Sequence, residues 1–128
     1  MLEKVDINAL LRPHPPRTNF NIFQVDGSHN LRVARIFGEY PWHSHPSHDE
    51  AWVVLKGSVT IQTEAGRLPL KAGDAVRIPA GLRHSPTTSE SDTTVLIVNS
   101  KDFQTRYLHG DSDESAGYTE IDLDPGNR

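Results

Sequence analysis

Short runs rich in valine, isoleucine, threonine and aromatic residues fill residues 20–100, and glycine, proline and serine interrupt them at close intervals. In Ser58–Thr63 apolar and polar residues alternate, and this two-residue period is typical of a strand with one buried face. Many short strands without a long helix favour a β-sandwich or a closed barrel, since closure removes exposed strand edges. The expected strands are Asn21–Val25, Leu31–Phe37, Ala51–Leu55, Ser58–Thr63, Arg67–Leu70, Asp74–Ile78 and Thr93–Asn99.

The segments on both sides of this region have a different composition. Residues 1–19 are expected to form an arm with one short helix, Val5–Leu11, which the prolines at positions 13, 15 and 16 would end. Residues 101–128 are expected to form an acidic, mobile tail, because the acidic and small residues at 110–117 bury too little apolar surface to offset the entropy of ordering. Three apolar residues of this tail are candidates for docking on a partner: Tyr118, Ile121 and Leu123.

The composition excludes several classes of site. The chain has no cysteine, so disulfides, thiolate zinc sites and cysteine nucleophiles are ruled out, and any metal must be bound through nitrogen or oxygen. The net charge is -4 and no segment gathers lysine and arginine, which argues against DNA or RNA as a partner. No apolar run approaches the length of a membrane span, and the N-terminal region does not read as a signal peptide. We therefore expect a cytoplasmic protein without a membrane partner.

Candidate metal ligands gather in one stretch, residues 38–57, and recur once further along the chain. His43 and His45 are two residues apart on extended chain, so their side chains point to the same side and can reach one ion. Glu50 stands at the start of the next expected strand, close enough in an antiparallel arrangement to add a carboxylate oxygen. Much later, a Pro-x-Gly turn at residues 79–81 follows a strand and leads to His84.

Together these two segments resemble the paired motifs of the cupin superfamily, which are a histidine pair followed by a glutamate and a glycine, and later Pro-x-Gly-x-x-His. The resemblance covers residues 31–99 and implies an all-β, single-domain jelly-roll barrel, also called a double-stranded β-helix, over residues 20–100. It implies one divalent metal ion inside the barrel, with four ligands: His43, His45, Glu50 and His84. It also implies a homodimer, with the N-terminal arm as a candidate interface element. Two positions depart from the pattern without being ligands: Gly38 lies one residue nearer the histidines than usual, and Thr88 stands where asparagine is common.

This ligand set suits a borderline transition metal ion. Three neutral imidazoles and one carboxylate can bind Fe, Mn, Ni, Zn, Co or Cu, and ligand type does not select among them. Because one carboxylate does not neutralise a dication, the site favours an anionic or enolisable oxygen ligand. We therefore expect a small acid, an enol or a sugar derivative as the substrate.

Other polar residues near the motifs have competing interpretations. Asp49 is adjacent to Glu50 and therefore faces the opposite side of a strand, so we expect it to be solvated or paired. His48 matches no motif position and is expected at the rim or the surface. Arg35 either clamps a substrate carboxylate inside the barrel or lies outside, where a bulge would shift the strand parity. Trp52 shares its parity with Glu50 and is expected to pack beside the metal.

These residues predict a metalloenzyme that binds a small oxygen-bearing substrate. One branch is dioxygenation, which needs a redox-active metal, and the other uses the ion as a Lewis acid for isomerisation or lyase chemistry. The second branch requires a general base, for which Tyr40, His48 and Glu39 are candidates. The competing interpretation is a non-catalytic module that binds or senses a small molecule in a metal-dependent way, since a fold does not decide function.

Overall fold

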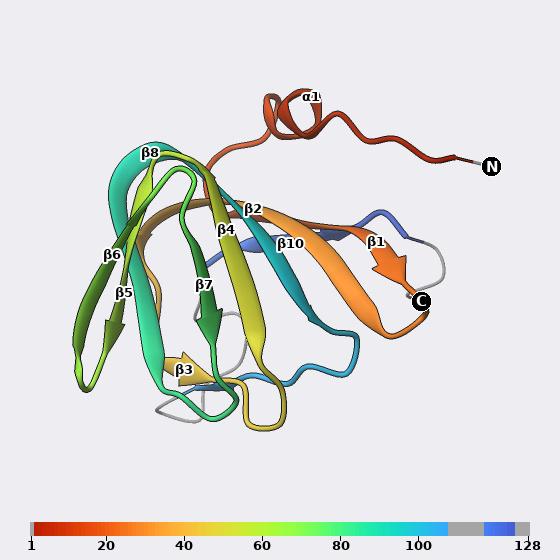
Figure 1. Ribbon diagram of the computed structural model, residues 1–128. Helices are drawn as coiled ribbons and strands as arrows, with labels where there is room; N and C mark the ends of the chain where they lie inside the picture. The colour runs from red at the N-terminus through yellow and green to blue at the C-terminus, as the bar shows by residue number, and fades with distance from the viewer. Residues whose placement is uncertain (1, 108–116, 125–128) are drawn as a thin grey trace.

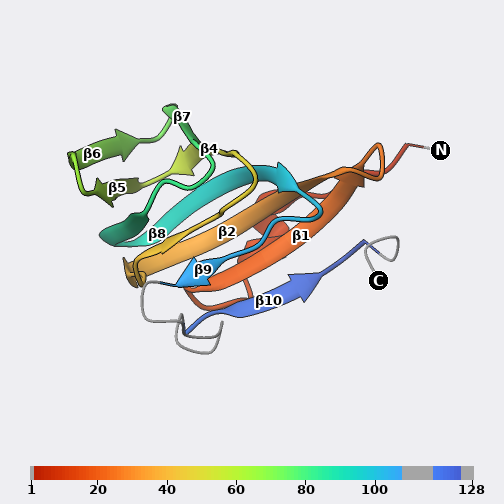
Figure 2. The same cartoon turned by 90° about the horizontal axis from the view of Figure 1, so that it is seen from below.

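The computed structural model describes residues 2–107 and 117–124, which form one ten-stranded sheet and one short helix (Figure 1). The sheet curls around an interior, with β5, β6 and β7 on one side and β1, β2 and β10 on the other (Figure 2). No helix in the described part of the chain is both long enough and apolar enough to cross a membrane. The elements are α1 (Ile7–Leu11), β1 (Thr18–Val25), β2 (His29–Glu39), β3 (His43–Ser44), β4 (Glu50–Lys56), β5 (Ser58–Thr63), β6 (Gly66–Lys71), β7 (Ala75–Ile78), β8 (His84–Ser100), β9 (Arg106–Tyr107) and β10 (Thr119–Asp122).

The long strand β8 organises the sheet, because it pairs with β2, β3, β4 and β5. The sequence predicted only its second half, Thr93–Asn99, because the polar residues before it resemble a loop. In the structure this polar half is held by antiparallel hydrogen bonding to β3 and β5, which overrides its weak strand propensity. One strand therefore carries His84 at its beginning and Asn99 near its end.

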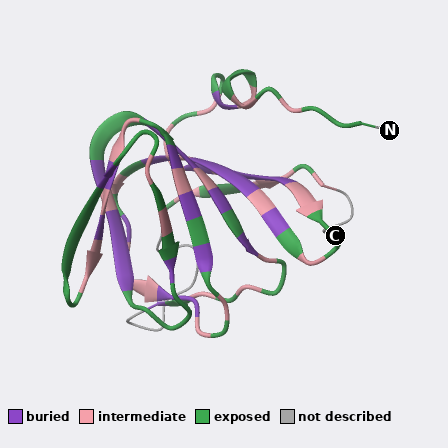
Figure 3. Cartoon of the chain, viewed as in Figure 1, coloured by how far each residue is buried: buried purple, intermediate pink, exposed green. Residues whose placement is uncertain are grey.

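The two faces of the sheet have different neighbours. The inner face holds the main apolar cluster of the barrel, and Figure 3 shows buried and exposed residues alternating along several strands. The outer face of β1 and β2 is covered near Phe20 and Val33 by the helix α1, whose Leu11 is buried against them. The N-terminal arm thus packs on the sheet of its own chain. The inner cluster consists of Ala34, Ile36, Tyr40, Trp52, Val54, Val59, Ile61, Leu70, Ile78, Val95 and Ile97.

The helix α1 begins two residues later than predicted. Asp6 has extended backbone, and its side-chain Oδ1 accepts a hydrogen bond from the amide of Ala9 at 3.1 Å. A residue with this role caps the helix and lies outside it. Val5 packs beside the Leu11 cluster without being helical.

Regular structure continues beyond the boundary expected at residue 100. The short strand β9 pairs with β3, and β10 runs parallel to β1 at the edge of the sheet (Figure 2). Ile121, expected in a mobile tail, packs against the apolar cluster under α1, and this contact helps to hold β10 in place. Most of the acidic stretch at 110–117, and His109, lie outside the described residues.

Gly38 lies at an irregularity that shapes the entrance to the metal motif. The register between β2 and β8 shifts between Ile36 and Gly38, and Gly38 has a φ of +82°. This left-handed backbone favours glycine because a Cβ atom would be strained there. Beyond this bulge the chain turns through Tyr40 toward β3.

Candidate metal centre

The strands β3 and β8 bring three histidines together. His43 and His84 are directly opposite each other in the antiparallel pairing of the two strands. The ring centroids of His43 and His84 are 4.3 Å apart, and the ring of His45 lies 5.1 Å from the first and 5.6 Å from the second. One potential ligand nitrogen from each ring lies within 4.8 Å of the other two. This three-histidine cluster is able to hold a metal ion.

A backbone carbonyl fixes each of the three imidazoles. The Nδ1 atoms of His43, His45 and His84 lie 2.8 Å, 2.9 Å and 2.9 Å from the carbonyl oxygens of Pro41, Gln104 and Leu82. Because a carbonyl oxygen can only accept, each Nδ1 donates, and the Nε2 lone pair of a neutral ring is left for a ligand. Such hydrogen bonds are the usual way in which proteins orient metal-binding histidines.

Burial keeps two of these rings neutral. It lowers the pKa of His43 from 6.5 to about 4, and the neighbouring His84 acts in the same direction. Burial also lowers the pKa of His84 to about 4, against the opposing effect of the Leu82 carbonyl. The His84 side chain is 0% exposed, and its Nε2 has no hydrogen-bond partner among the described residues. A buried acceptor of this kind fits a bound cation better than it fits an apolar environment.

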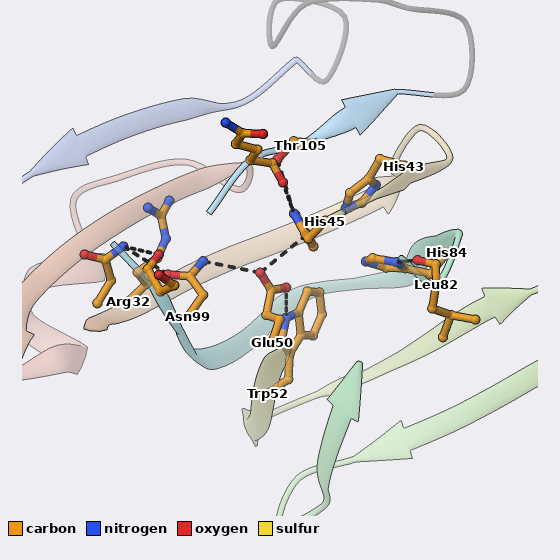
Figure 4. A network of polar contacts seen from close by, with 12 residues as sticks. Arg32, His43, His45, Glu50, Trp52, Leu82, His84, Asn99 and Thr105 are labelled. Atoms are coloured by element: carbon orange, nitrogen blue, oxygen red, sulfur yellow. Dashed lines mark hydrogen bonds and ion pairs between the residues drawn. The ribbon is translucent and has the colours of Figure 1, made fainter. Parts of the chain in front are cut away.

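Glu50 lies beside the cluster at the start of β4. Its Oε1 accepts a hydrogen bond from Trp52 Nε1 at 2.6 Å, and its Oε2 accepts one from Asn99 Nδ2 at 3.3 Å (Figure 4). The same Oε2 is 3.5 Å from Nε2 of His45. The imidazole nitrogen of His45 and the carboxylate oxygen of Glu50 are therefore close enough to bind the same cation. Three imidazoles and one carboxylate are a donor set that fits a divalent transition metal.

A cavity of about 90 Å³ opens next to these groups. This is enough space for several water molecules or one small organic molecule. One part of its wall is apolar and aromatic, and another part carries amide, carboxylate and guanidinium groups. The lining residues include His43, His45, Glu50, Trp52, Tyr40, Arg32, Asn19, Asn99, Phe103, Tyr107, Tyr118 and Glu120.

The structure places Asp49 and His48 away from this cavity. Asp49 is exposed, and its Oδ1 accepts a hydrogen bond from the amide of Ala80 at 2.8 Å, so it holds a turn. His48 belongs neither to the three-histidine cluster nor to the cavity wall. Among the candidate bases, Glu39 is exposed and accepts a hydrogen bond from Gln62 at 3.2 Å outside the cavity. Tyr40 is the candidate base that lines the cavity.

Arg35 lies on the outer face of β2, which corrects the interpretation of this residue as a clamp inside the barrel. Its Nη1 donates to the backbone carbonyl of His14 at 2.7 Å, and its Nη2 is 3.6 Å from Asp92. The bulge that was expected to put Arg35 outside is not what does so, because the register shift occurs after Ile36; Arg35 shares the outer face with Val33 by ordinary strand alternation. The inward arginine is Arg32, which shares strand parity with the cavity-lining Ala34.

Several cavity residues were not predicted from the sequence. The alternation along β2 was a usable signal for Arg32, because Ala34 and Ile36 define an apolar face that continues to it. Glu120 had no such signal, since its place depends on the parallel pairing of β10 with β1 about a hundred residues away in the chain. Asn99 was assigned to a strand without a role, and the structure makes it a hydrogen-bond donor to Glu50.

The metal-free protein is expected to lose stability as the pH falls from about 7 to about 4. His43 and His84 have a pKa of about 4 when folded and 6.5 as the ordinary value, so the unfolded chain binds more protons between these limits. The free energy of unfolding therefore rises with pH across this window. Between pH 7.5 and pH 5, His84 alone accounts for a loss of about 2 kcal/mol.

Urea unfolding with a chelator present measures this loss. The variant His84→Gln should reduce the pH dependence and leave the part that is due to His43, while His29→Gln, at an exposed position, should leave it unchanged. Equal free energies of unfolding at the two pH values in the wild-type protein would show that the histidines are not buried in the neutral form.

Comparisons with known proteins agree with this architecture. The family model described as the Cupin domain matches residues 37–99. The uncharacterized protein YdbB of Bacillus subtilis (strain 168) is 40% identical over 88 residues, which cover 68% of this chain and 76% of that protein.

Solved structures show the same fold. A cupin-2 domain containing protein from Shewanella frigidimarina superposes with a TM-score of 0.68 at 23% identity, over 73% of this chain and 91% of that one. The DMSP lyase DddQ from Ruegeria pomeroyi DSS-3 superposes with a TM-score of 0.58 at 24% identity, over 69% of this chain and 47% of that one. Taken with the motifs, the jelly-roll sheet and the three-histidine cluster, these matches show that the chain belongs to the cupin family.

Proposed function

We propose that this cupin is a metalloenzyme that transfers a proton on a small oxygen-bearing substrate, by isomerisation or by elimination. His43, His45 and His84, with Glu50 as the fourth ligand, are the residues that would hold a divalent transition metal ion. Such an ion supplies Lewis-acid polarisation of a substrate oxygen. The cavity beside it has the size for a small organic acid or sugar derivative.

The hydroxyl of Tyr40 is the observation that carries this proposal. The Tyr40 side chain lines the same cavity as His43 and Glu50, and it is buried. Burial raises the pKa of Tyr40 above its ordinary value, although the Arg17 guanidinium, 4.2 Å from the ring centroid, and the backbone of Phe37 act in the opposite direction. Tyr40 is therefore a protonated phenol at neutral pH. A protonated phenol on a residue that lines the cavity is suited to give a proton to a bound molecule.

The comparisons do not distinguish the two branches. The solved lyase whose fold resembles this chain is an enzyme by its description, and at 24% identity the likeness shows the fold alone. Every cavity residue that would serve dioxygenation would serve proton transfer equally well. Proton transfer is therefore the branch to test first.

Replacing Tyr40 with phenylalanine is expected to slow hydrogen exchange at C3 by a factor of about 10² to 10⁴. In the proposed step a solvent water takes the C3 proton to give an enolate, and the Tyr40 hydroxyl returns a proton to the enolate and is re-protonated by solvent; the variant removes this donor and keeps the ring. The measurement uses metal-loaded protein in deuterium oxide with 2-oxopentanoate as the probe, and proton NMR follows the exchange of the C3 hydrogens. Chelated protein should show no exchange above background. The Tyr40→Phe variant should retain the metal content of the wild-type protein.

Two results would contradict the proposal. Equal exchange rates in the wild-type protein and Tyr40→Phe would show that this hydroxyl does not transfer the proton. Oxygen uptake by the metal-loaded protein, without hydrogen exchange, would replace proton transfer by dioxygenation.

A further inference from the structure

A buried cation lies in the cavity wall, on β2. The side chain of Arg32 is 8% exposed, and its Nη2 pairs with Oε1 of Glu120. Its guanidinium also lies over the ring of Phe103, with Cζ 5.4 Å from the ring centroid. Arg32 and Glu120 both belong to the lining of the cavity that borders the histidines.

The surroundings of Arg32 leave much of its binding capacity unused. A guanidinium has five N–H donors, and Glu120 is the one hydrogen-bond acceptor that the described residues offer to it. Removing such a cation from water is costly, and one buried ion pair seldom repays that cost in stability. The nearby Asn19 also lines the cavity and has a buried Oδ1 without a hydrogen-bond partner in the described part of the chain. Unused polar groups that meet at one cavity indicate a polar ligand.

The strand pairing gives the separation between Arg32 and Trp52, a residue beside the metal cluster. Arg32 and Trp52 are both paired with Ile97 of β8, one from each side, so they lie in the same row across the inner face. Two strand spacings place their Cα atoms about 10 Å apart. Trp52 donates a hydrogen bond to Glu50, the carboxylate beside the three histidines, so one end of this row lies next to the metal cluster and the guanidinium lies at the other.

We propose that Arg32 binds a carboxylate of the substrate, while another oxygen of the same molecule reaches the metal cluster. This inference builds on the proposed function and narrows its substrate to small organic acids with an oxygen-bearing group a few atoms away from the carboxylate. Carboxylate is the favoured anion because the guanidinium already holds one, that of Glu120. The Glu120 side chain is 43% exposed and lies on an edge strand, so it can turn into solvent and give up its place to the ligand.

A pair of probes that differ only at the far end tests this assignment. 2-Oxoglutarate and 2-oxopentanoate share a metal-chelating 2-oxo acid group and a five-carbon chain, and only the first carries a distal carboxylate. Calorimetric titration into nickel-loaded wild-type protein should give a Kd at least about tenfold lower for 2-oxoglutarate. In Arg32→Gln this preference should vanish while the Kd of 2-oxopentanoate stays the same, and Arg32→Lys should restore part of the preference. In Glu120→Gln the Kd of 2-oxoglutarate should fall, because the competing carboxylate has been removed.

Two outcomes overturn the inference: no preference for 2-oxoglutarate in the wild-type protein, or an undiminished preference in Arg32→Gln. The wild-type comparison needs no variant, so a misfolded Arg32→Gln protein, detected by circular dichroism, does not prevent a decision. If the protein binds no nickel, the proposed function fails separately. Titration of glutarate into metal-free protein then tests Arg32 by itself. Binding of glutarate by the wild-type protein, and weaker binding by Arg32→Lys, would support the role of Arg32 as a carboxylate site. No binding of glutarate by the wild-type protein would overturn it.

Discussion

Replacing His84 with alanine is expected to abolish metal binding, with a loss of affinity of at least about 100-fold. His84 is the most deeply buried histidine of the cluster, and its Nε2, which makes no hydrogen bond to the described residues, is available to bind the ion. Its ring also borders both other histidines, so its removal widens the site from two sides. Mass spectrometry of the metal content after purification should give about one ion per wild-type chain and a negligible fraction in the variant.

The matched control is His48→Ala, which removes a histidine from the loop between the ligands. His48 is outside the cluster and outside the cavity wall, so this variant should bind metal as the wild-type protein does. Full metal content in His84→Ala, or loss of metal in His48→Ala, would contradict the assignment of the ligands.

Gly57→Ala is expected to destabilise the fold by more than about 3 kcal/mol. Gly57 has a φ of +77° in the turn between β4 and β5. A Cβ atom there would lie 2.4 Å from Oγ1 of Thr93 and 2.9 Å from its Cα. Thr93 is 0% exposed and belongs to β8, so relief of the clash requires the turn to move away from the central strand. Urea unfolding followed by circular dichroism measures the change.

Gly27→Ala is the matched control for this prediction. Gly27 has a similar φ of +63°, but no atom lies within 4 Å of the place where its Cβ would be. This variant carries only the backbone strain, of about 1 kcal/mol. Equal losses in the two variants would show that the contact with Thr93 is not what requires a glycine at position 57.

The histidine pair of the cluster was predictable from the sequence because its geometry is local. His43 and His45 share a face by strand parity, and the choice of Glu50 over Asp49 follows from the same rule. In the structure Asp49 accepts a hydrogen bond from a turn, and Glu50 lies 3.5 Å from His45, so the choice of Glu50 as a ligand stays a prediction. The meeting of these residues with His84 depends on long-range pairing, and it followed from the resemblance to paired family motifs.

The opposite wall of the cavity was not predictable in the same way. Arg35 was considered as the inward arginine because its neighbours on the strand, Val33 and Phe37, are apolar. In the structure Val33 packs under the helix α1 on the outer face, and Phe37 is exposed. Apolar periodicity identifies a buried face without saying which layer buries it. Glu120 is brought in by β10, and no local pattern predicts that an acidic C-terminal segment pairs with the first strand.

X-ray absorption at the metal edge tests the central claim most directly, since it reports the ligands of the ion without a crystal. Protein loaded with zinc should show nitrogen or oxygen neighbours at about 2.0–2.2 Å together with the multiple scattering of about three imidazoles. A spectrum without imidazole scattering, or a protein that retains no zinc, would contradict the convergence of His43, His45 and His84 on one ion.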